Sequence, residues 1–182
     1  MVFLEWQNQE VKTAPPYLLW ENRIVWPGRI ATSDEELMRL AIRLGSAGQA
    51  RGAGNPFGSV IADRTGRVIA AGANLLHATV DATAHAEVVA IRRAQAARRS
   101  ADLRGLRLFT SCAPCIMCAG AAHWAGIGEV VAGARSADAA QAGFVEGPPD
   151  YDAGKLLREL GVRVREDVLR SEALELLRRF RA

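Results

Sequence analysis

Three cysteines, Cys112, Cys115 and Cys118, stand three residues apart, and the chain has no others. An odd and tightly spaced set is not typical of a disulfide framework, in which an even number of cysteines links separate loops. The set fits a reducing compartment and indicates a bound metal or a reactive thiol. If a helix begins near Cys115, the side chains of Cys115 and Cys118 share one of its faces, and the positive end of the helix dipole favours their thiolates. The spacing therefore favours a helix start at this point, which limits how the chain can fold.

The segment Thr83-Ala-His85-Ala-Glu87 supplies what the two thiols lack. Zinc prefers nitrogen and sulfur ligands in a tetrahedron, and three protein ligands leave the fourth position open for water, as a catalytic site requires. Zinc can lower the pKa of such a water to about 7. Glu87 is the candidate that moves protons between water and substrate. Because residues two apart on a helix do not normally share a face, this role requires that the first helical turn aim His85 and Glu87 into one pocket.

The hydrophobic pattern predicts alternating helices and strands after residue 32. The predicted elements are a helix from Ser33 into the Gly-rich stretch 45–54, a hairpin of strands 57–62 and 67–73, a helix at 84–100, a strand at 106–110, a helix at 115–125, a strand at 129–134, short helices near 136–142 and 153–160, a strand at 162–165 and a last helix with an apolar face from Leu169 to Phe180. Ser33 and Glu36 have the spacing of a capping box. Strands separated by helices imply right-handed crossovers and a sheet covered on both faces, and the hairpin makes the sheet mixed. We therefore expect an α/β fold.

The 182 residues suit one domain with a sizeable core. We expect that domain at 33–182, after an N-terminal arm at 1–32 in which Pro15-Pro16 resists regular structure. No run of 18 or more apolar residues occurs, and the start lacks the basic and apolar regions of a secretory signal. These features predict a cytoplasmic protein with no membrane partner.

Two of these segments resemble the zinc-dependent cytidine/deoxycytidylate deaminase superfamily, whose signature is H-x-E followed by P-C-x-x-C. They are His85-Ala86-Glu87 and Pro114-Cys115-Ile116-Met117-Cys118. The resemblance extends over roughly 33–182. It implies a three-layer α/β/α fold with a mixed central sheet of about five strands, one zinc ion per chain on His85, Cys115 and Cys118, and Glu87 as general acid/base. Relatives of this kind are usually homodimers, so a homodimer is expected.

Within the superfamily, four local segments are similar to those of guanine deaminases. They are Asn55-Pro56-Phe57-Gly58, Asn74, Ala122-His123-Trp124-Ala125 and Ala142-Gly143-Phe144-Val145-Glu146. The resemblance implies that Phe57 and Trp124 form flat walls for a ring, that Asn74 reads the ring edge, and that Glu146 accepts hydrogen bonds and helps to move protons. We add Ala86, between ligand and acid/base, to the expected substrate contacts. The implied reaction of purine metabolism is hydrolysis of guanine, at its amino-bearing C2, to xanthine and ammonia by zinc-activated water.

The sequence also departs from the guanine deaminase pattern. Val145 stands where that family often has an acidic residue, which leaves only Glu146 to do that work. Ala113 precedes Pro114, at a position where a glutamate is common. A structural zinc site with Cys112 as fourth ligand is an alternative, although Pro114 breaks helical continuity between Cys112 and Cys115. His77 and His123 are further candidate ligands, with ordinary loop or pocket positions as the simpler interpretation.

Three rival functions stay open. Met117-Cys118-Ala-Gly-Ala121 and Gly133-Ala-Arg135 also resemble tRNA adenosine deaminases, and the Arg-rich tail at 178–181 could contribute a basic face. The net charge of +3 is weak evidence for a nucleic-acid partner. A second rival is a deaminase of another small aminated heterocycle, such as an aminotriazine or cytosine. A third is a zinc-stabilised interaction protein without catalysis.

Overall fold

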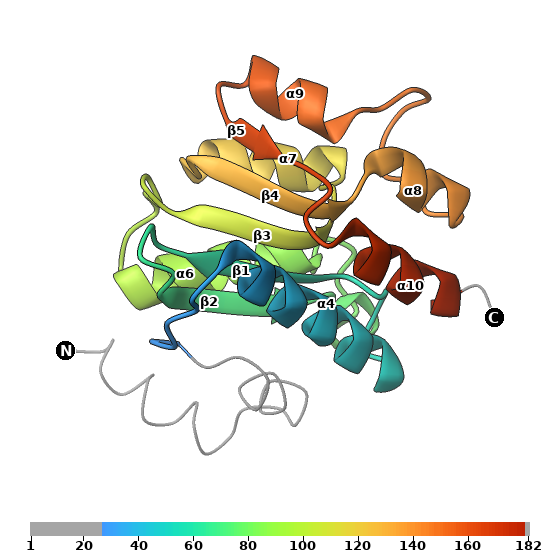
Figure 1. Ribbon diagram of the computed structural model, residues 1–182, viewed down its shortest axis with the longest axis horizontal. Coiled ribbons are helices and arrows are strands. Elements are labelled where there is room, and N and C mark those ends of the chain that lie inside the picture. Colours follow the sequence, from blue (N-terminus) through green and yellow to red (C-terminus); the bar gives the residue numbers. More distant parts are fainter. Residues whose placement is uncertain (1–26, 181–182) are drawn as a thin grey trace.

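A mixed five-stranded sheet runs through the centre of the computed structural model, which describes residues 27–180 (Figure 1). In spatial order, the strands are β2 (Val68–Ala73), β1 (Gly58–Ala62), β3 (Arg107–Cys112), β4 (Glu129–Ala134) and β5 (Arg163–Arg165). β1 is antiparallel to both β2 and β3, whereas β3, β4 and β5 are parallel to one another. The mixed sheet expected from the sequence is confirmed.

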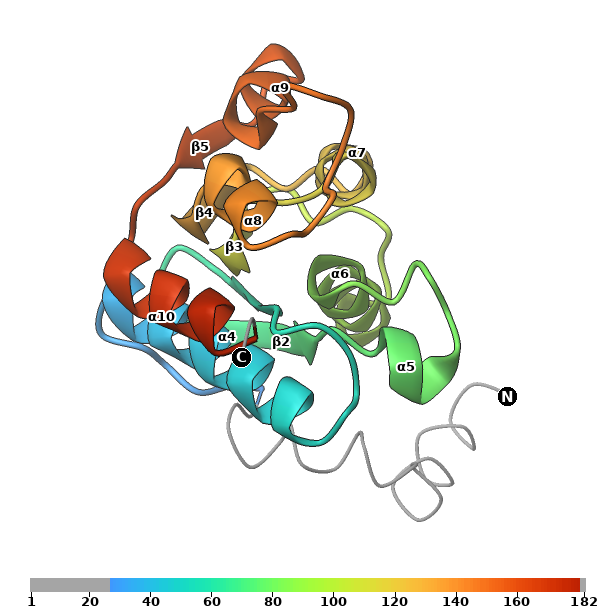
Figure 2. The same ribbon diagram turned by 90° about the vertical axis from the view of Figure 1, so that its right-hand side faces the viewer.

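Helices cover both faces of this sheet. They are α4 (Asp34–Ala50), α5 (Leu76–Thr79), α6 (Ala86–Arg98), α7 (Ile116–Trp124), α8 (Ser136–Gln141), α9 (Ala153–Glu159) and α10 (Arg170–Phe180). Figure 2 shows α4 and α10 on one face and α6 and α7 on the other. The predicted three-layer α/β/α arrangement is therefore confirmed.

The start of α4 differs in one detail from the predicted capping box. Ser33 is the N-cap, and its hydroxyl accepts a hydrogen bond from the Glu36 backbone N–H. The Glu36 carboxylate reaches one residue further back than expected and accepts from the Thr32 backbone N–H at 2.8 Å. The hydrogen bond from the Thr32 backbone N–H, and then the ion pair with Arg29, lower the pKa of Glu36 to about 2.

The end of α4 lies inside the Gly-rich stretch, at Ala50, so the helix continues through Gly45. A Cβ atom at Gly45 would come within 2.8 Å of the Pro56 carbonyl oxygen. Glycine at this position lets α4 pass close to the backbone that leads into β1. Its role is packing rather than termination of the helix.

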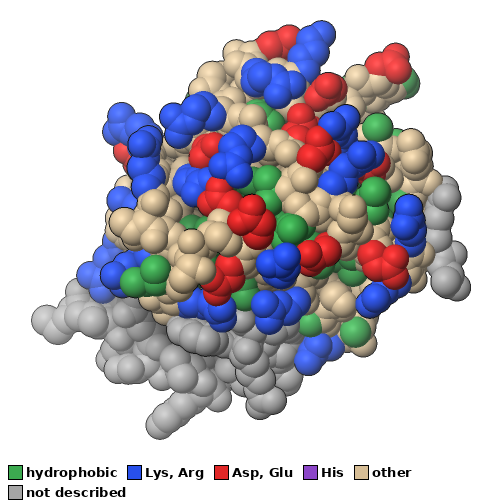
Figure 3. All heavy atoms as spheres, in the orientation of Figure 1, with side chains coloured by type: hydrophobic (Ala, Val, Ile, Leu, Met, Phe, Trp, Pro, Cys, Tyr) green, Lys and Arg blue, Asp and Glu red, His purple; other side chains and the backbone are tan. Residues whose placement is uncertain are grey.

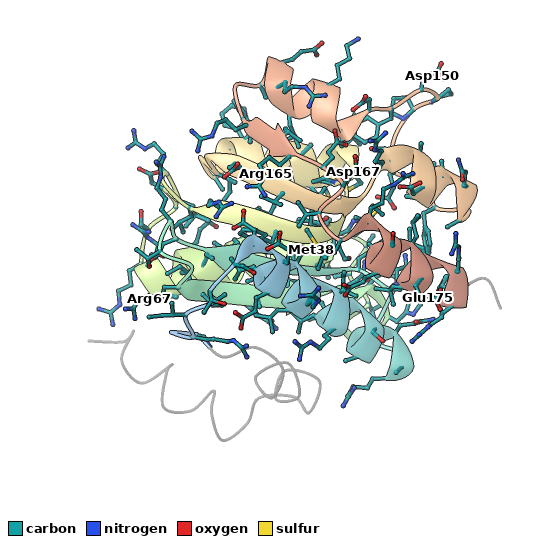
Figure 4. All side chains as sticks on the ribbon, in the orientation of Figure 1. Met38, Arg67, Asp150, Arg165, Asp167 and Glu175 are labelled. Carbon is teal, nitrogen blue, oxygen red and sulfur yellow. The ribbon has the colours of Figure 1, made fainter. Side chains whose placement is uncertain are left out.

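The core has two principal layers, one on each face of the sheet. Alternate strand residues such as Val60 and Phe109 pack with α4, while their neighbours Ile61 and Leu108 pack with α6 and α7. Met38 of α4, labelled in Figure 4, is fully buried. Burial of each large apolar side chain contributes about 1.5–3 kcal/mol, so these layers fix the position of β3 between the helices.

Ion pairs hold the amino end of β3. Arg107 donates two hydrogen bonds to Asp34, at 2.8 and 2.7 Å, and one to Glu129 at 2.8 Å. Arg165, labelled in Figure 4, also bonds Asp34. The hydrogen bonds from Arg107 lower the pKa of the Asp34 carboxyl. This network ties the start of α4 to β3, β4 and β5, at the end of the sheet opposite the carboxyl end of β3.

Only the last six residues of the expected arm, 27–32, fall within the described part of the chain. Gly28 N–H donates to the Val68 carbonyl at 2.8 Å, and Ile30 forms an isolated bridge with Arg67. Residues 1–26 lie outside the described residues, so the predicted division into arm and domain stays a prediction. Within 27–180, no helix has the length and apolar character needed to cross a membrane.

Gly58→Ala should destabilise the protein strongly. A Cβ atom at Gly58 would lie 2.2 Å from the Ala41 carbonyl oxygen and 2.6 Å from the Gly45 nitrogen, so α4 would have to move away from β1. Overpacking of this kind costs roughly 1–3 kcal/mol, occasionally more. Gly120→Ala is the matched control, since its Cβ atom meets nothing within 4 Å and alanine favours the helix. Chemical unfolding of both variants checks this, and equal stabilities would contradict the packing role.

Candidate active site

Two helices begin beside the carboxyl end of β3, and their first residues bring the expected ligands together. His85 is the N-cap of α6, with φ −66° and ψ 153°, and Cys115 is the N-cap of α7, with φ −66° and ψ 168°. Cys118 lies in the first turn of α7, where its backbone N–H points at the Cys115 sulfur at 3.4 Å. Open α/β sheets bind ligands at this end of their parallel strands.

The three side chains fit a single zinc ion. The Cys115 Sγ lies 3.5 Å from the His85 Nδ1, and the ligand atoms of His85, Cys115 and Cys118 all lie within 4.8 Å of one another. In a tetrahedron with usual zinc bond lengths, a nitrogen and a sulfur ligand are about 3.5 Å apart. Both cysteines are buried, and His85 is half-buried. Geometry, ligand types and burial therefore agree with the ion that the sequence predicted.

The other candidate ligands lie outside this group. Cys112 is buried at the end of β3, with its Sγ 3.8 Å from the Arg135 carbonyl oxygen. His77 is exposed on α5. The His123 Nδ1 lies 3.0 Å from the Leu160 carbonyl oxygen, so it connects the end of α7 to the end of α9. Across residues 27–180, the group that could hold a metal contains His85 and the two expected cysteines, without Cys112.

Glu87 shares a pocket with His85, as its expected role requires. The extended backbone at the N-cap turns His85 out of the helical path, so the two side chains are not separated as helical positions i and i+2 would be. Both line a small inner pocket, and Glu87 is only 5% exposed. The pocket volume is about 10 Å³, the space that one water molecule needs by the same measure.

The electrostatics of this group favour proton transfer and metal binding. Burial raises the pKa of Glu87, with a further contribution from the Cys115 thiolate. Hydrogen bonding by Cys118, and then by His85, lowers the pKa of Cys115 to about 4. The pKa of Cys118 is raised, because its S–H is shared with Cys115 and is buried. The lowered pKa of Cys115 favours the thiolate, the form that binds metals. Cys118 must lose its proton when a metal binds, and so must His85, whose pKa the hydrogen bond with Cys115 raises to about 9.

Phe57 and Glu146, together with Cys112 and Ala113, form the other walls of the inner pocket. Phe57 packs edge-on against Phe144, with ring centroids 4.9 Å apart. Glu146 is held by its backbone carbonyl, which accepts from Ile116 N–H at 2.9 Å, and it also lines an adjoining cavity of about 460 Å³. Burial, and then the negative charges of Cys115 and Glu87, raise its pKa to about 7. Glu146 thus stands beside the ligands although it comes from a loop far along the chain.

Asn74 is fully buried at the end of β2, and its orientation is fixed. Its Oδ1 accepts hydrogen bonds from the backbone N–H groups of Asn55, at 3.3 Å, and Leu76, at 3.2 Å. Its Nδ2 has no hydrogen-bond partner among the described residues. A buried donor without a partner costs free energy, so this amide is free to donate to an acceptor. Asn74 itself is not among the residues that line the inner pocket or the adjoining cavity.

Two of the expected substrate contacts differ in the structure. Trp124 is 86% exposed at the far end of α7 and stacks edge-on with His123, away from both pockets. At about 1.5 Å per residue, Trp124 lies about 9 Å along α7 from Cys118 and about 13 Å from Cys115. Within one chain it therefore does not form the predicted ring wall. Ala86 is fully buried in a cluster with Phe57 and Cys112. Its methyl group faces the core, which leaves only its backbone to meet a substrate.

Sequence reasoning missed two residues that support the site. Thr110 donates a hydrogen bond to the Glu87 carboxylate, and the Tyr151 hydroxyl donates to the Pro114 carbonyl at 3.0 Å. No motif or regular spacing in the sequence points to either residue. A polar residue within the apolar strand 106–110 was the one available hint for Thr110.

Comparisons with known proteins agree with this geometry. The model of the cytidine and deoxycytidylate deaminase zinc-binding region matches residues 31–134. A guanine deaminase of Bacillus subtilis is 44% identical over 110 residues, which cover 60% of this chain and 70% of that protein. A tRNA-specific adenosine deaminase of Haemophilus influenzae is 37% identical over 101 residues, 56% of this chain and 58% of that protein. A solved structure of guanine deaminase from Nitrosomonas europaea superimposes with a TM-score of 0.82 and 34% identity, covering 92% of this chain and 93% of that one.

The separation of Cys112 from the other two thiols predicts different metal contents for two variants. Cys118→Ala should lose most bound zinc, because it removes one of three ligands. Cys112→Ala removes an equally buried thiol outside the group and should keep close to one zinc per chain. Metal analysis of the purified, dialysed variants measures both. Equal loss of zinc from the two variants would contradict the assignment and favour a site that includes Cys112.

Proposed function

The chain belongs to the family of cytidine and deoxycytidylate deaminases, and on that premise we propose that it deaminates guanine hydrolytically to xanthine and ammonia. The observation that carries this proposal is one small pocket shared by His85, Glu87 and Glu146, next to both ligand thiols. Similarity to guanine deaminases in sequence and in fold supports the choice of ring. We propose that one zinc ion per chain is bound by His85, Cys115 and Cys118. When bound, it would supply Lewis acidity that lowers the pKa of a water molecule.

Glu87 is the proposed general acid/base. A water proton passes to its carboxylate as the water oxygen bonds to C2 of guanine. The same proton then passes to a ring nitrogen. The proton of the hydroxyl now attached to C2 passes through Glu87 to the amino group, which leaves as ammonia as the C2 carbonyl forms. Water is consumed, the C2–N bond breaks, and the carboxylate is regenerated. Burial supports this role, because a raised pKa brings Glu87 closer to neutral pH, where a group can both take and give a proton.

Three side chains are proposed to hold the ring. Phe57 offers an apolar wall that is backed by Phe144. Asn74 donates from Nδ2, since its Oδ1 is occupied by two backbone N–H groups. That donor matches a carbonyl oxygen or an unprotonated ring nitrogen, both of which guanine has. Glu146, when ionised, accepts from a ring N–H or the amino group and shares in proton transfer.

A small molecule is the proposed partner rather than a nucleic acid. On the face drawn in Figure 3, where α4 and α10 lie, acidic and basic side chains are intermixed, so this face has no one-sign patch of the kind that a phosphate backbone favours. We propose a homodimer in the cytoplasm, where the thiols stay reduced. The exposed Trp124 and Ile116 side chains on α7 support such an interface. α10 packs on α4 and β4 of its own chain, as the apolar face of the last helix allowed.

The direct test measures ammonia released by zinc-loaded protein from guanine, adenine, cytosine, cytidine and aminotriazines. Guanine should be the best substrate. Glu87→Gln should lower kcat by about 10²–10⁴, the usual contribution of general acid–base catalysis, and should keep its zinc because the three ligands remain. A fully active Glu87→Gln would remove Glu87 from the mechanism. Inosine formed in tRNA, without ammonia from guanine, would favour the tRNA deaminase instead. No turnover of any ring by the loaded protein would favour an interaction protein.

Asn74→Asp should weaken guanine binding, and because it buries a carboxyl group it should also lower stability, which thermal melts measure separately from binding. The aspartate keeps an oxygen for the Asn55 and Leu76 N–H groups, but it replaces the free donor Nδ2 with an acceptor. We expect KM to rise by about tenfold or more, because an acceptor then faces an acceptor. Steady-state kinetics and thermal melts measure this, with Asn55→Asp as control, since Asn55 contributes a backbone group. An unchanged KM for Asn74→Asp would show that its amide does not read the ring.

A further inference from the structure

Two hydroxyl groups are buried on the sheet face that α6 and α7 cover. Ser59 in β1 and Thr110 in β3 are both fully buried, on the same face as the apolar Ile61 and Leu108. Ser59 and Thr110 are direct cross-strand partners in the antiparallel pair. Burying a hydroxyl costs free energy unless it is hydrogen-bonded, so the partners of these two groups are informative.

The two hydroxyls form a chain that ends on Glu87. Ser59 Oγ donates to Thr110 Oγ1 at 3.1 Å, and Thr110 Oγ1 donates to Glu87 Oε1 at 2.9 Å. Each hydroxyl carries one proton. When Glu87 is ionised, it can only accept, so the Thr110 proton must point at Oε1 and the Ser59 proton at Thr110. The direction of both hydrogen bonds is thereby fixed.

From this chain we propose that Thr110, supported by Ser59, is a positioning residue that anchors Glu87 Oε1 and leaves Oε2 to carry the catalytic proton. The inference rests on the proposed role of Glu87 in deamination. Rotation about the last torsion of a glutamate is nearly free, so an unanchored carboxylate would present either oxygen over a wide range of angles. A fixed Oε1 confines Oε2 to one orientation in the pocket, which is the condition for fast proton transfer.

The proton balance leaves the two hydroxyls unchanged. Oε2 takes two protons in turn, one from water and one from the hydroxyl then attached to C2, and passes them to the ring nitrogen and to the leaving amino group, so the carboxylate starts and ends ionised. Thr110 and Ser59 neither gain nor lose a proton in the cycle. Their contribution is to orientation, and its loss should appear in kcat rather than in substrate binding.

A purely structural role is the alternative. Cross-strand Ser–Thr pairs stabilise antiparallel strands by modest amounts whether or not a carboxylate is near. Ser111 provides the matched comparison, since it lies on β3 next to Thr110, is equally buried and accepts a hydrogen bond from Gly58 N–H at 3.1 Å on the opposite face. Removal of its hydroxyl tests the strand without touching Glu87.

The experiment compares zinc-loaded Thr110→Val, Thr110→Ser, Ser59→Ala and Ser111→Ala with the wild-type chain, using guanine and the ammonia assay. Thr110→Val keeps the side-chain shape and should lower kcat by about tenfold or more, with KM and zinc content within about twofold of wild type. Thr110→Ser keeps the hydroxyl and should recover most of kcat. Ser59→Ala should give a smaller loss, and Ser111→Ala should lower only the melting temperature. Wild-type kcat in Thr110→Val, or equal losses in Thr110→Val and Thr110→Ser, would overturn the proposal.

A double-mutant cycle supplies a readout that does not depend on turnover. Thr110→Val and Glu87→Ala, singly and together, are compared in unfolding midpoint. If the Thr110 hydroxyl anchors Glu87, the shifts in unfolding midpoint should be non-additive, because the hydroxyl and the carboxylate stabilise each other. Additive shifts would overturn it. If the shifts are non-additive but the wild-type protein releases no ammonia from guanine, the contact between Thr110 and Glu87 stands and the proposed function is removed instead.

Discussion

The meeting of two helix starts beside the carboxyl end of β3 is the constraint on which the rest of the site depends. His85 and Cys115 are both N-caps with extended backbone, so each side chain leaves its helix sideways and faces the other across 3.5 Å. The positive ends of α6 and α7 converge there, which favours the thiolate at Cys115. Arg107 fixes the amino end of β3 by ion pairs, while the helices pack on its carboxyl end. A shift of either helix by one residue would separate the imidazole from the sulfurs.

Around this point the core is apolar, and two of its buried polar residues, Glu87 and Asn74, have roles in the proposed chemistry. Glu87 is buried with a hydroxyl on one oxygen, and Asn74 is buried with its carbonyl satisfied and its amide nitrogen free. Such groups weaken a core, since a hydrophobic residue would pack there without a desolvation cost. Their presence is therefore better explained by chemistry than by stability. The inner pocket that Glu87 lines has space for about one water molecule.

Much of this architecture could be predicted from the sequence because it depends on local patterns. The element order, the mixed sheet and the convergence of His85 with two cysteines follow from hydrophobic period, from turn residues and from two short motifs. Trp124 was misplaced because a similar sequence position says nothing about which way the far end of α7 points. Thr110 was missed because one hydroxyl in a strand has no spacing signal, and its contact with Glu87 joins residues 23 apart. Contacts between elements, unlike the elements themselves, depend on the packed structure.

The most direct test of the central claim is X-ray absorption at the zinc edge of the purified, metal-loaded protein. Grouping of His85, Cys115 and Cys118 predicts two sulfur ligands at about 2.3 Å, one imidazole nitrogen at about 2.0–2.1 Å and one further light-atom ligand from solvent. Replacing Glu87 by glutamine should leave that first coordination shell unchanged. Three sulfur ligands, or a shell without imidazole, would contradict the account, because Cys112 would then have to join the site or His85 to leave it.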